Sequence, residues 1–209
     1  MENKVENFEK IEVENEEMDI FFILDRSGSM YGSEKDTISG YNSFIEKQLS
    51  KKQNINVTTI LFDDKYETLY SQKPITMIKP LTADEYFVRG STALLDAIGK
   101  TVTDYERTTK NALCIITTDG LENSSKEFNK KQIKEMIENH NWKFIFIGSG
   151  IDSYAEAGQI GIKQDYVANY EKTEEGINDL FEAVDLAVDF CYCESDRELD
   201  KSWKEKLEV

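Results

Sequence analysis

Asp25, Ser27 and Ser29 are the residues of this chain whose types and spacing are best suited to chemistry. They lie in a tight Asp-Arg-Ser-Gly-Ser-Met segment that directly follows the apolar run at 21–24. A carboxylate and two hydroxyls at the end of a buried strand form half of a shell for a hard metal ion, because such ions prefer oxygen ligands. The rest of the shell must come from elsewhere in the chain.

Two further oxygen-bearing side chains occupy suitable positions. Thr92 stands at the start of a segment with helical spacing, and Asp119 ends the apolar run at 112–119. Their loops converge on the first segment if the strand that ends at Asp119 lies beside the strand that ends at Asp25, because function gathers at the carboxyl ends of parallel strands. The expected metal-binding residues are Asp25, Ser27, Ser29, Thr92 and Asp119.

The strands that must position these residues are read from apolar and alternating runs. The first run is almost continuously apolar, which is typical of a central strand covered by helices on both faces. Only Asp63 and Asp64 separate the second run from the third, and this spacing predicts an antiparallel hairpin. The expected strands lie at 18–24, 54–63, 65–71, 112–119, 143–149 and near 166–167.

Segments with helical periodicity alternate with these strands. They lie at 34–49, near 92–105, around 133–137, at 152–158 and at 177–191. Alternating strands and helices imply a parallel sheet between two helical layers, because each parallel connection needs a right-handed crossover. We therefore expect a three-layer, Rossmann-like α/β fold with a mostly parallel sheet of order 3-2-1-4-5-6 and one antiparallel edge strand.

The 209 residues are expected to form one folded domain, since no low-complexity or proline-rich linker divides them. We interpret 1–17 as an acidic tail, because it carries seven glutamates against two lysines. An edge strand around Ile11 and Val13 is the alternative. The domain itself is expected over 18–193, and a charged C-terminal extension follows at 194–209.

Composition bears on partners and on location. The formal net charge is −16 and the pI is near 4.5, which argues against a nucleic-acid partner because the field of the protein repels phosphates. A divalent cation or a basic protein surface fits this charge better. The sequence shows no secretory leader and no apolar run of membrane-spanning length, so we expect a cytoplasmic protein without a membrane partner.

Cysteine and histidine offer little for a metal site. Cys114 lies in an apolar run, where a small buried side chain is the default, and Cys191 and Cys193 point to different faces of an expected helix. His140 is the only histidine, which weakens any proposal of a zinc site built from histidines or of a dedicated histidine base.

The pattern Asp25-x-Ser27-x-Ser29 with a distant Thr92 and a distant Asp119 resembles the metal-ion-dependent adhesion site of von Willebrand factor A domains. The resemblance covers approximately 18–191 and is strongest to stand-alone bacterial and phage members with this segment, some of them similar to proteins of tellurium-resistance loci. It implies that the serines and the threonine hold Mg²⁺ directly or nearly so. The aspartates then act largely through water, and a partner carboxylate fills the open position.

Each element also has a simpler interpretation. Asp-x-Ser-x-Ser alone is ordinary turn chemistry, Thr92 alone is a good helix N-cap, and Asp119 with Gly120 is a common turn pair. Asp96 could brace the site, but a solvated or helix-start carboxylate is the simpler expectation. Sequences similar to phosphate-binding and dinucleotide-binding loops lack required glycines, since Leu94 and Ser153 stand in their places.

The leading hypothesis is a non-enzymatic module that binds a protein partner through Mg²⁺ and an aspartate or glutamate of that partner, in a bacterial stress-response or phage-related system. Mn²⁺ and Ca²⁺ are alternative ions. A metal-assisted phosphohydrolase with Asp25 as nucleophile is the first alternative, although Ser27 stands where such enzymes carry a second aspartate. The second is a scaffold in which the metal is only structural.

Overall fold

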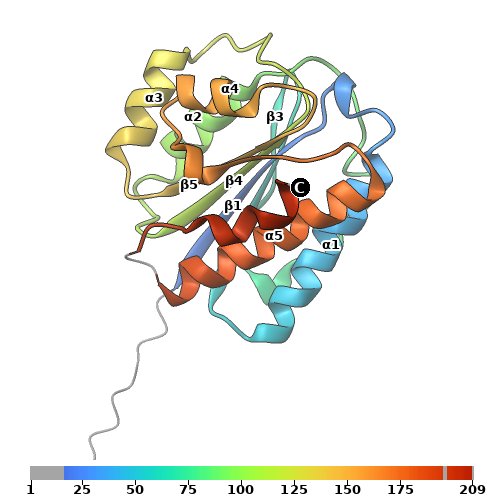
Figure 1. Ribbon diagram of the computed structural model, residues 1–209, viewed down its shortest axis with the longest axis vertical. Helices are drawn as coiled ribbons and strands as arrows, with labels where there is room; N and C mark the ends of the chain where they lie inside the picture. The colour runs from blue at the N-terminus through green and yellow to red at the C-terminus, as the bar shows by residue number, and fades with distance from the viewer. Residues whose placement is uncertain (1–16, 195–196, 209) are drawn as a thin grey trace, which may run out of the picture.

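Six strands alternate with helices through most of the chain in the computed structural model, which describes residues 17–194 and 197–208 (Figure 1). The acidic tail and the edge strand expected around Ile11 and Val13 lie outside the described residues. Each predicted strand is present at nearly its predicted position. The strands are β1 (Met18–Asp25), β2 (Ile55–Phe62), β3 (Tyr66–Pro74), β4 (Ala112–Thr118), β5 (Lys143–Gly148) and β6 (Val167–Asn169).

The helices also fall where the periodicity predicts them. The α-helices are α1 (Glu34–Lys51), α2 (Leu94–Tyr105), α3 (Lys130–Asn139), α4 (Ser153–Gln159) and α5 (Glu174–Cys193). Short 3-10 helices complete the described elements, namely η1 (Gly28–Met30), η2 (Ile75–Met77), η3 (Gln164–Tyr166) and η4 (Lys201–Leu207).

The sheet has the strand order β3-β2-β1-β4-β5-β6, and β2 with β3 is its antiparallel pair. This confirms the predicted three-layer α/β fold and its strand order. In the register of the central strands, Asp25 pairs with Phe62 of β2, and Leu24 pairs with Thr117 of β4. The carboxyl ends of β1 and β4 therefore lie side by side, which is what the proposed convergence of loops requires.

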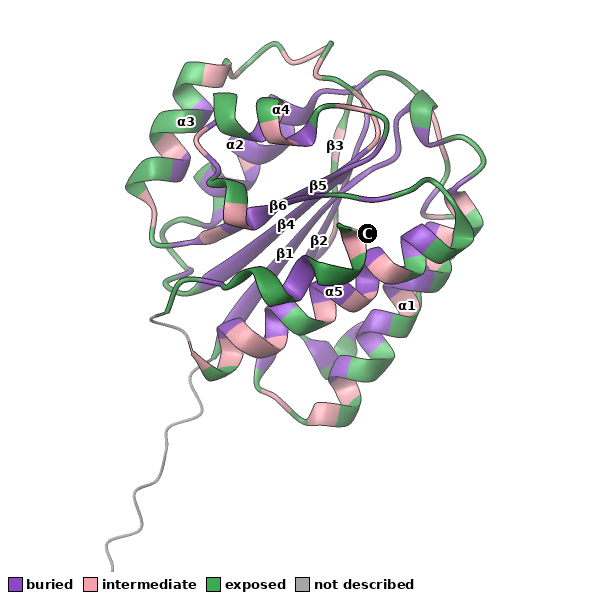
Figure 2. Ribbon diagram, in the orientation of Figure 1, coloured by how far each residue is buried: buried purple, intermediate pink, exposed green. Residues whose placement is uncertain are grey.

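Helices cover both faces of the sheet (Figure 1). α1 and α5 lie against one face, while α2, α3 and α4 lie against the other (Figure 1), and the helices carry both buried and exposed residues (Figure 2). All residues of β1 and β4 are buried, as expected for central strands that lose apolar surface to helices on both sides. This core holds the ends of β1 and β4 in fixed positions.

The C-terminal segment folds back onto the domain through η4. Trp203 and Lys204 are each only 2% exposed. The Trp203 indole donates to the Asp165 carbonyl at 3.0 Å, and the Lys204 ammonium donates to the Val167 carbonyl at 2.7 Å. The described part of the charged extension thus packs against the strand and helices that precede it.

Candidate metal centre

Backbone hydrogen bonds join the loop after β1 to two neighbouring loops. The Arg26 amide donates to the Phe62 carbonyl at 2.8 Å, and the Gly28 amide donates to the Gly90 carbonyl at 3.1 Å. A Cβ added to Gly28 would lie 3.3 Å from that same Gly90 carbonyl oxygen, so glycine permits this close approach. The segment after β1 is therefore held directly against the chain that leads to Thr92.

Three hydroxyl groups meet where these loops converge. The Thr92 Oγ1 donates to Ser27 Oγ at 3.0 Å, and Ser27 Oγ lies 3.0 Å from Ser29 Oγ. Gly120 lies against the same group, because a Cβ added there would be 2.7 Å from Thr92 Oγ1 and 3.0 Å from Ser29 Oγ. Ser27 and Thr92 are buried, whereas Ser29 is exposed. The structure thus gathers three neutral oxygen donors beside the Asp119–Gly120 turn.

Asp25 is fully buried beside the hydroxyls, and both of its carboxylate oxygens are engaged. Oδ1 accepts from the Ser27 amide at 2.6 Å, and Oδ2 accepts from the Thr118 hydroxyl at 2.5 Å. Burial raises the pKa of Asp25 to about 6, although hydrogen bonds from Thr118 and Ser27 oppose this rise. A nearby cation would favour the ionised carboxylate, because an opposite charge offsets the cost of burial.

Asp119 is the second carboxylate of the group and follows β4 directly. Its side chain is 4% exposed, and its Oδ2 lies 2.7 Å from the Lys172 ammonium. Its other oxygen, Oδ1, is buried and has no hydrogen-bond partner in the described part of the chain. A buried carboxylate oxygen without a partner is costly, so this atom is suited to a cation or to a water bound to one.

The five predicted residues therefore lie together, and we refer to Asp25, Ser27, Ser29, Thr92 and Asp119 as the hydroxyl–carboxylate centre. Lys172 also contacts this centre, although it is not among the residues predicted from the sequence. Its ammonium donates to the Ser29 carbonyl as well as pairing with Asp119. A single lysine in a polar segment between β6 and α5 carries no spacing signal that points to β1 or β4.

The helix-cap interpretation of Thr92 is wrong. α2 begins at Leu94, and its N-cap residue is Ala93, which makes no side-chain cap. The Thr92 hydroxyl instead points to Ser27, while its backbone amide donates to Asn123 Oδ1 at 3.0 Å. Thr92 lies just before the helix because its backbone is tied to the loop after β4.

Asp96 is buried, so the expectation of a solvated carboxylate is wrong, although it does lie in the first turn of α2. Its carboxylate accepts backbone amides of Lys126, Glu127 and Phe128 at 2.8–2.9 Å. Burial acts to raise the pKa of Asp96, but these amide hydrogen bonds outweigh it and lower the pKa. Asp96 thus fixes the loop that follows Asp119 against the helix that follows Thr92.

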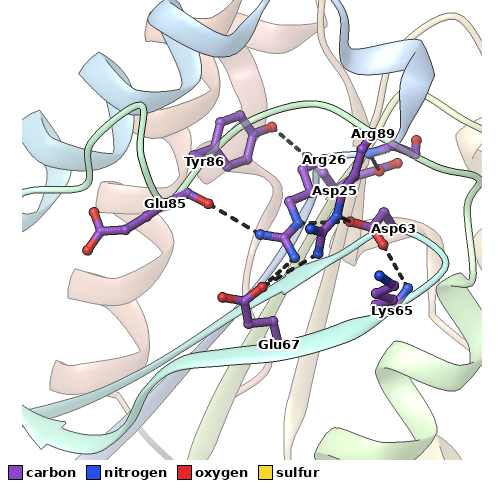
Figure 3. A network of polar contacts seen from close by, with 9 residues as sticks. Asp25, Arg26, Asp63, Lys65, Glu67, Glu85, Tyr86 and Arg89 are labelled. Carbon is purple, nitrogen blue, oxygen red and sulfur yellow. Dashed lines mark hydrogen bonds and ion pairs between the residues drawn. The ribbon is translucent and has the colours of Figure 1, made fainter.

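A second polar cluster surrounds Arg26 in the segment after β1 (Figure 3). We call Arg26, Asp63, Glu67 and Arg89 the arginine network. Arg26 Nε donates to Asp63 Oδ2 at 3.0 Å and Nη2 donates to Glu67 Oε2 at 2.6 Å, while Arg89 Nε donates to Asp63 Oδ2 at 2.7 Å. Arg26 and Asp63 are fully buried. No local sequence signal marks this network, because Arg26, Arg89 and the β2–β3 hairpin that carries Asp63 and Glu67 are far apart in the chain.

The arginine network holds the chain around Thr92 in place. The Arg89 amide donates to the Arg26 carbonyl at 2.9 Å, and the Ala93 amide donates to the Asp63 carbonyl at 2.9 Å. Burial alone would raise the pKa of Asp63, but hydrogen bonds from Arg89 and the Lys65 amide lower it below its usual value. Asp63 therefore stays ionised and paired at neutral pH.

Other metal and membrane signals are weak across the described residues. Within 17–194 and 197–208, no three His, Cys, Asp or Glu side chains gather to hold a metal ion. Any metal site in this part of the chain would depend on other donors, such as hydroxyls. Cys114 is buried, as predicted, and the burial of Cys191 beside the exposed Cys193 agrees with the prediction that they point to different faces of the helix. No helix in the described ranges combines the length and apolar character needed to span a bilayer.

Solved structures share this fold at low sequence identity. The vWF domain of the type V pili tip protein Mfa5 from Porphyromonas gingivalis is 10% identical, with a TM-score of 0.63 over 81% of this chain and 95% of that one. Manganese-loaded TRAP protein from Plasmodium vivax is 21% identical, with a TM-score of 0.57 over 80% and 74%. Proximal thread matrix protein 1 from the mussel byssus is 16% identical, with a TM-score of 0.60. The match covers 81% of this chain but only 45% of that one.

Family membership rests on a sequence model. No curated protein matches the chain as a relative. The model of the von Willebrand factor type A domain matches residues 19–183, from β1 into α5. Domains of this family typically mediate protein–protein interaction or adhesion. Because the match spans most of the chain, this protein belongs to the von Willebrand factor type A domain family.

Proposed function

We propose that this protein is a Mg²⁺-dependent protein-binding module, in which the hydroxyl–carboxylate centre is a metal-ion-dependent adhesion site. The ion would be held by Ser27, Ser29 and Thr92, and a carboxylate of the partner would complete its coordination. One observation carries the proposal: three hydroxyls within hydrogen-bond distance adjoin two carboxylates, one of which has a buried oxygen without a partner among the residues that the structure describes.

The residues fit a hard divalent ion. Mg²⁺ binds oxygen ligands in octahedral geometry and usually keeps several waters. Asp25 would supply charge and orient Ser27 rather than ligate, since its oxygens already accept from Ser27 and Thr118. Asp119 Oδ1 is available to a bound water or to the ion. When bound, the ion supplies a Lewis-acid position for an anionic group, and Mn²⁺ or Ca²⁺ can take the same oxygen donors.

The surface around the centre supports a protein partner. Tyr31 is 80% exposed and Leu121 is 53% exposed, and they follow closely after Ser29 and Asp119 in the chain. Large exposed apolar side chains beside a polar site are typical of interaction surfaces. The fold similarity to manganese-loaded TRAP protein supports a metal in this family, and the net charge of −16 disfavours nucleic acid.

The same geometry disfavours hydrolysis. A nucleophilic aspartate needs a carboxylate oxygen that can reach substrate. Asp25 is 0% exposed, and each of its oxygens already accepts a hydrogen bond. Ser27 also leaves no second aspartate to act as general acid. We therefore propose a non-enzymatic role.

The cellular setting rests on the resemblance alone. We propose a cytoplasmic protein of a bacterial stress-response system similar to tellurium-resistance loci, or of a phage-related system. A partner that binds only when Mg²⁺ is present, recovered from such a host, would identify the pathway.

Calorimetric titration with Mg²⁺ and Mn²⁺ tests the metal site. We expect heat of binding for the native protein and none for Asp25→Ala. Asp104→Ala is the matched control, because Asp104 is exposed near the end of α2, about 15 Å along the helix from its start. Equal heats for native protein and Asp25→Ala would contradict the proposal.

Partner capture tests the second half of the proposal. Immobilised native protein and Asp104→Ala should retain a partner in Mg²⁺ and release it in EDTA, whereas Asp25→Ala should not retain it. Replacement of one aspartate or glutamate of the captured protein should abolish binding. Capture that survives both EDTA and Asp25→Ala would instead favour a scaffold with a structural metal.

A further inference from the structure

Lys172 places an ammonium group directly on the hydroxyl–carboxylate centre. It belongs to the segment between β6 and α5, and its side chain is 33% exposed. The ammonium lies 2.7 Å from Asp119 Oδ2 and also donates to the Ser29 carbonyl. Lys172 therefore bridges the two loops that would hold the ion, one after β1 and one after β4.

The backbone around Lys172 is anchored on both sides. Before it, the Tyr170 amide donates to the Gly148 carbonyl at 2.9 Å. After it, the Thr173 side chain caps α5 by accepting from the Gly176 amide at 3.0 Å. A Cβ added to Gly176 would lie 2.2 Å from the Glu171 carbonyl oxygen, so the chain turns tightly here. The fold thus fixes the backbone of Lys172 beside the centre, and the contacts with Asp119 and the Ser29 carbonyl place its ammonium.

Other basic groups near the segment after β1 are engaged elsewhere. Arg26 and Arg89 pair with Asp63 and Glu67 in the arginine network. Among the described residues, Lys172 is the basic side chain that forms an ion pair with the centre. It neutralises the carboxylate that has the unpartnered oxygen.

We propose that Lys172 is a built-in competitor of the divalent ion: its ammonium neutralises Asp119 in the metal-free protein and lowers the affinity of the centre for metal. This inference rests on the proposed metal site. A lysine ammonium is a compact point charge, so it repels a divalent ion held by the same carboxylate. Entry of the ion must displace the ammonium or overcome its repulsion.

Titration of Mn²⁺ and of Mg²⁺ alone into charge variants tests the inference. Lys172→Gln should bind both ions about tenfold more tightly than native protein, because it removes a positive charge beside the ion. Lys172→Arg keeps the positive charge, so its affinity for both ions should be closer to that of native protein than to that of Lys172→Gln. Lys163→Gln is the matched control, since Lys163 is 65% exposed and pairs with Glu198 away from the centre.

Thermal unfolding gives a second readout that does not depend on a partner. Without metal, Lys172→Gln should unfold at the same or a lower temperature than native protein, but saturating Mn²⁺ at one fixed concentration should raise its unfolding temperature more. If native protein binds metal and Lys172→Gln binds it equally or more weakly, the inference is wrong and the proposed function stands. If neither protein binds metal, both are wrong.

Discussion

The arginine network and the hydroxyl–carboxylate centre meet at the end of β1 but differ in how far their charges are paired. The arginine network sets two guanidinium groups against two carboxylates, and Asp63 and Glu67 both receive hydrogen bonds from arginine (Figure 3). The hydroxyl–carboxylate centre has two carboxylates and is contacted by the Lys172 ammonium, and Asp119 Oδ1 has no partner among the described residues. A cluster whose charges and hydrogen-bonding groups are all paired stabilises the fold, whereas a cluster with surplus negative charge can bind a cation.

The pKa values of the two buried aspartates express the same difference. Hydrogen bonds from arginine and backbone outweigh burial and lower the pKa of Asp63, whereas burial dominates at Asp25 and raises its pKa to about 6. Arg26 stands between Asp25 and Ser27 in the chain, so one segment serves both clusters. The comparison predicts that the first cluster controls stability and the second controls binding.

Removal of the Arg26 charge should have the largest effect on folding. Arg26→Met leaves Asp63 fully buried without its buried partner. Loss of one member of a buried ion pair typically costs about 3–5 kcal/mol, and we expect that loss in the free energy of unfolding measured with urea. Arg89→Gln should cost less, because Arg89 is 33% exposed. A loss below about 1 kcal/mol for Arg26→Met would show that the network is not structural.

The pH dependence of stability should separate the two aspartates. The pKa of Asp25 is raised in the folded state, so its stabilising contribution is full below the unfolded value near 3.8 and is lost as pH rises through about 6. The pKa of Asp63 is lowered in the folded state. Its contribution to stability is therefore fully present above the unfolded value near 3.8, and it is lost as pH falls through the lower folded pKa.

Unfolding of metal-free native protein and of Asp25→Asn at pH 4 and pH 7 measures this difference. The Asp25 contribution should fall by about 2 kcal/mol between pH 4 and pH 7, since each pKa unit corresponds to about 1.4 kcal/mol and the unfolded carboxyl is already partly ionised at pH 4. Native protein should therefore lose stability relative to Asp25→Asn as pH rises. A constant difference between the two proteins would contradict the raised pKa.

Loss of the Thr92 hydroxyl should affect binding more than folding. Thr92→Val removes one hydrogen bond to Ser27, so we expect a loss of about 1 kcal/mol in unfolding free energy. Metal affinity should fall as well, because a donor is gone. Thr103→Val is the control, since its hydroxyl donates to the Gly99 carbonyl within α2. Equal metal affinity in Thr92→Val and Thr103→Val would show that Thr92 does not bind the metal.

A methyl group at position 120 should change folding least. In Gly120→Ala the added Cβ would meet the hydroxyl oxygens of Thr92 and Ser29 at 2.7 and 3.0 Å, and these side chains can rotate away. We expect stability within about 1 kcal/mol of native protein but clearly weaker Mn²⁺ binding by calorimetry. Gly158→Ala has open space and should leave Mn²⁺ affinity unchanged. Undiminished affinity in Gly120→Ala would mean that the hydroxyls need not converge.

The sequence predicts the fold and the five residues of the centre because local signals mark them. The apolar runs that become β1 and β4 end at Asp25 and just before Asp119, and the strand order brings these ends together. The alternative interpretation of Thr92 as a helix N-cap fails because tertiary contacts outweigh a local preference: its hydroxyl contacts Ser27 and its amide contacts Asn123.

Long-range charge pairing is what the sequence does not reveal. Arg26 pairs with Asp63 and Glu67 of the β2–β3 hairpin, and Lys172 pairs with Asp119 from the segment between β6 and α5. Asp96 is buried only because the chain after β4 folds over it. None of these pairings has a periodicity or a local spacing, so they emerge only when the loops are placed in space.

Anomalous diffraction from crystals grown with Mn²⁺ tests the central claim most directly. We predict a manganese peak bounded by the hydroxyl oxygens of Ser27, Ser29 and Thr92, at about 2.0–2.2 Å from its oxygen ligands, and no peak at this position in crystals of Asp25→Ala. A manganese peak elsewhere, or none between these hydroxyls in native protein at saturating Mn²⁺, would contradict the account.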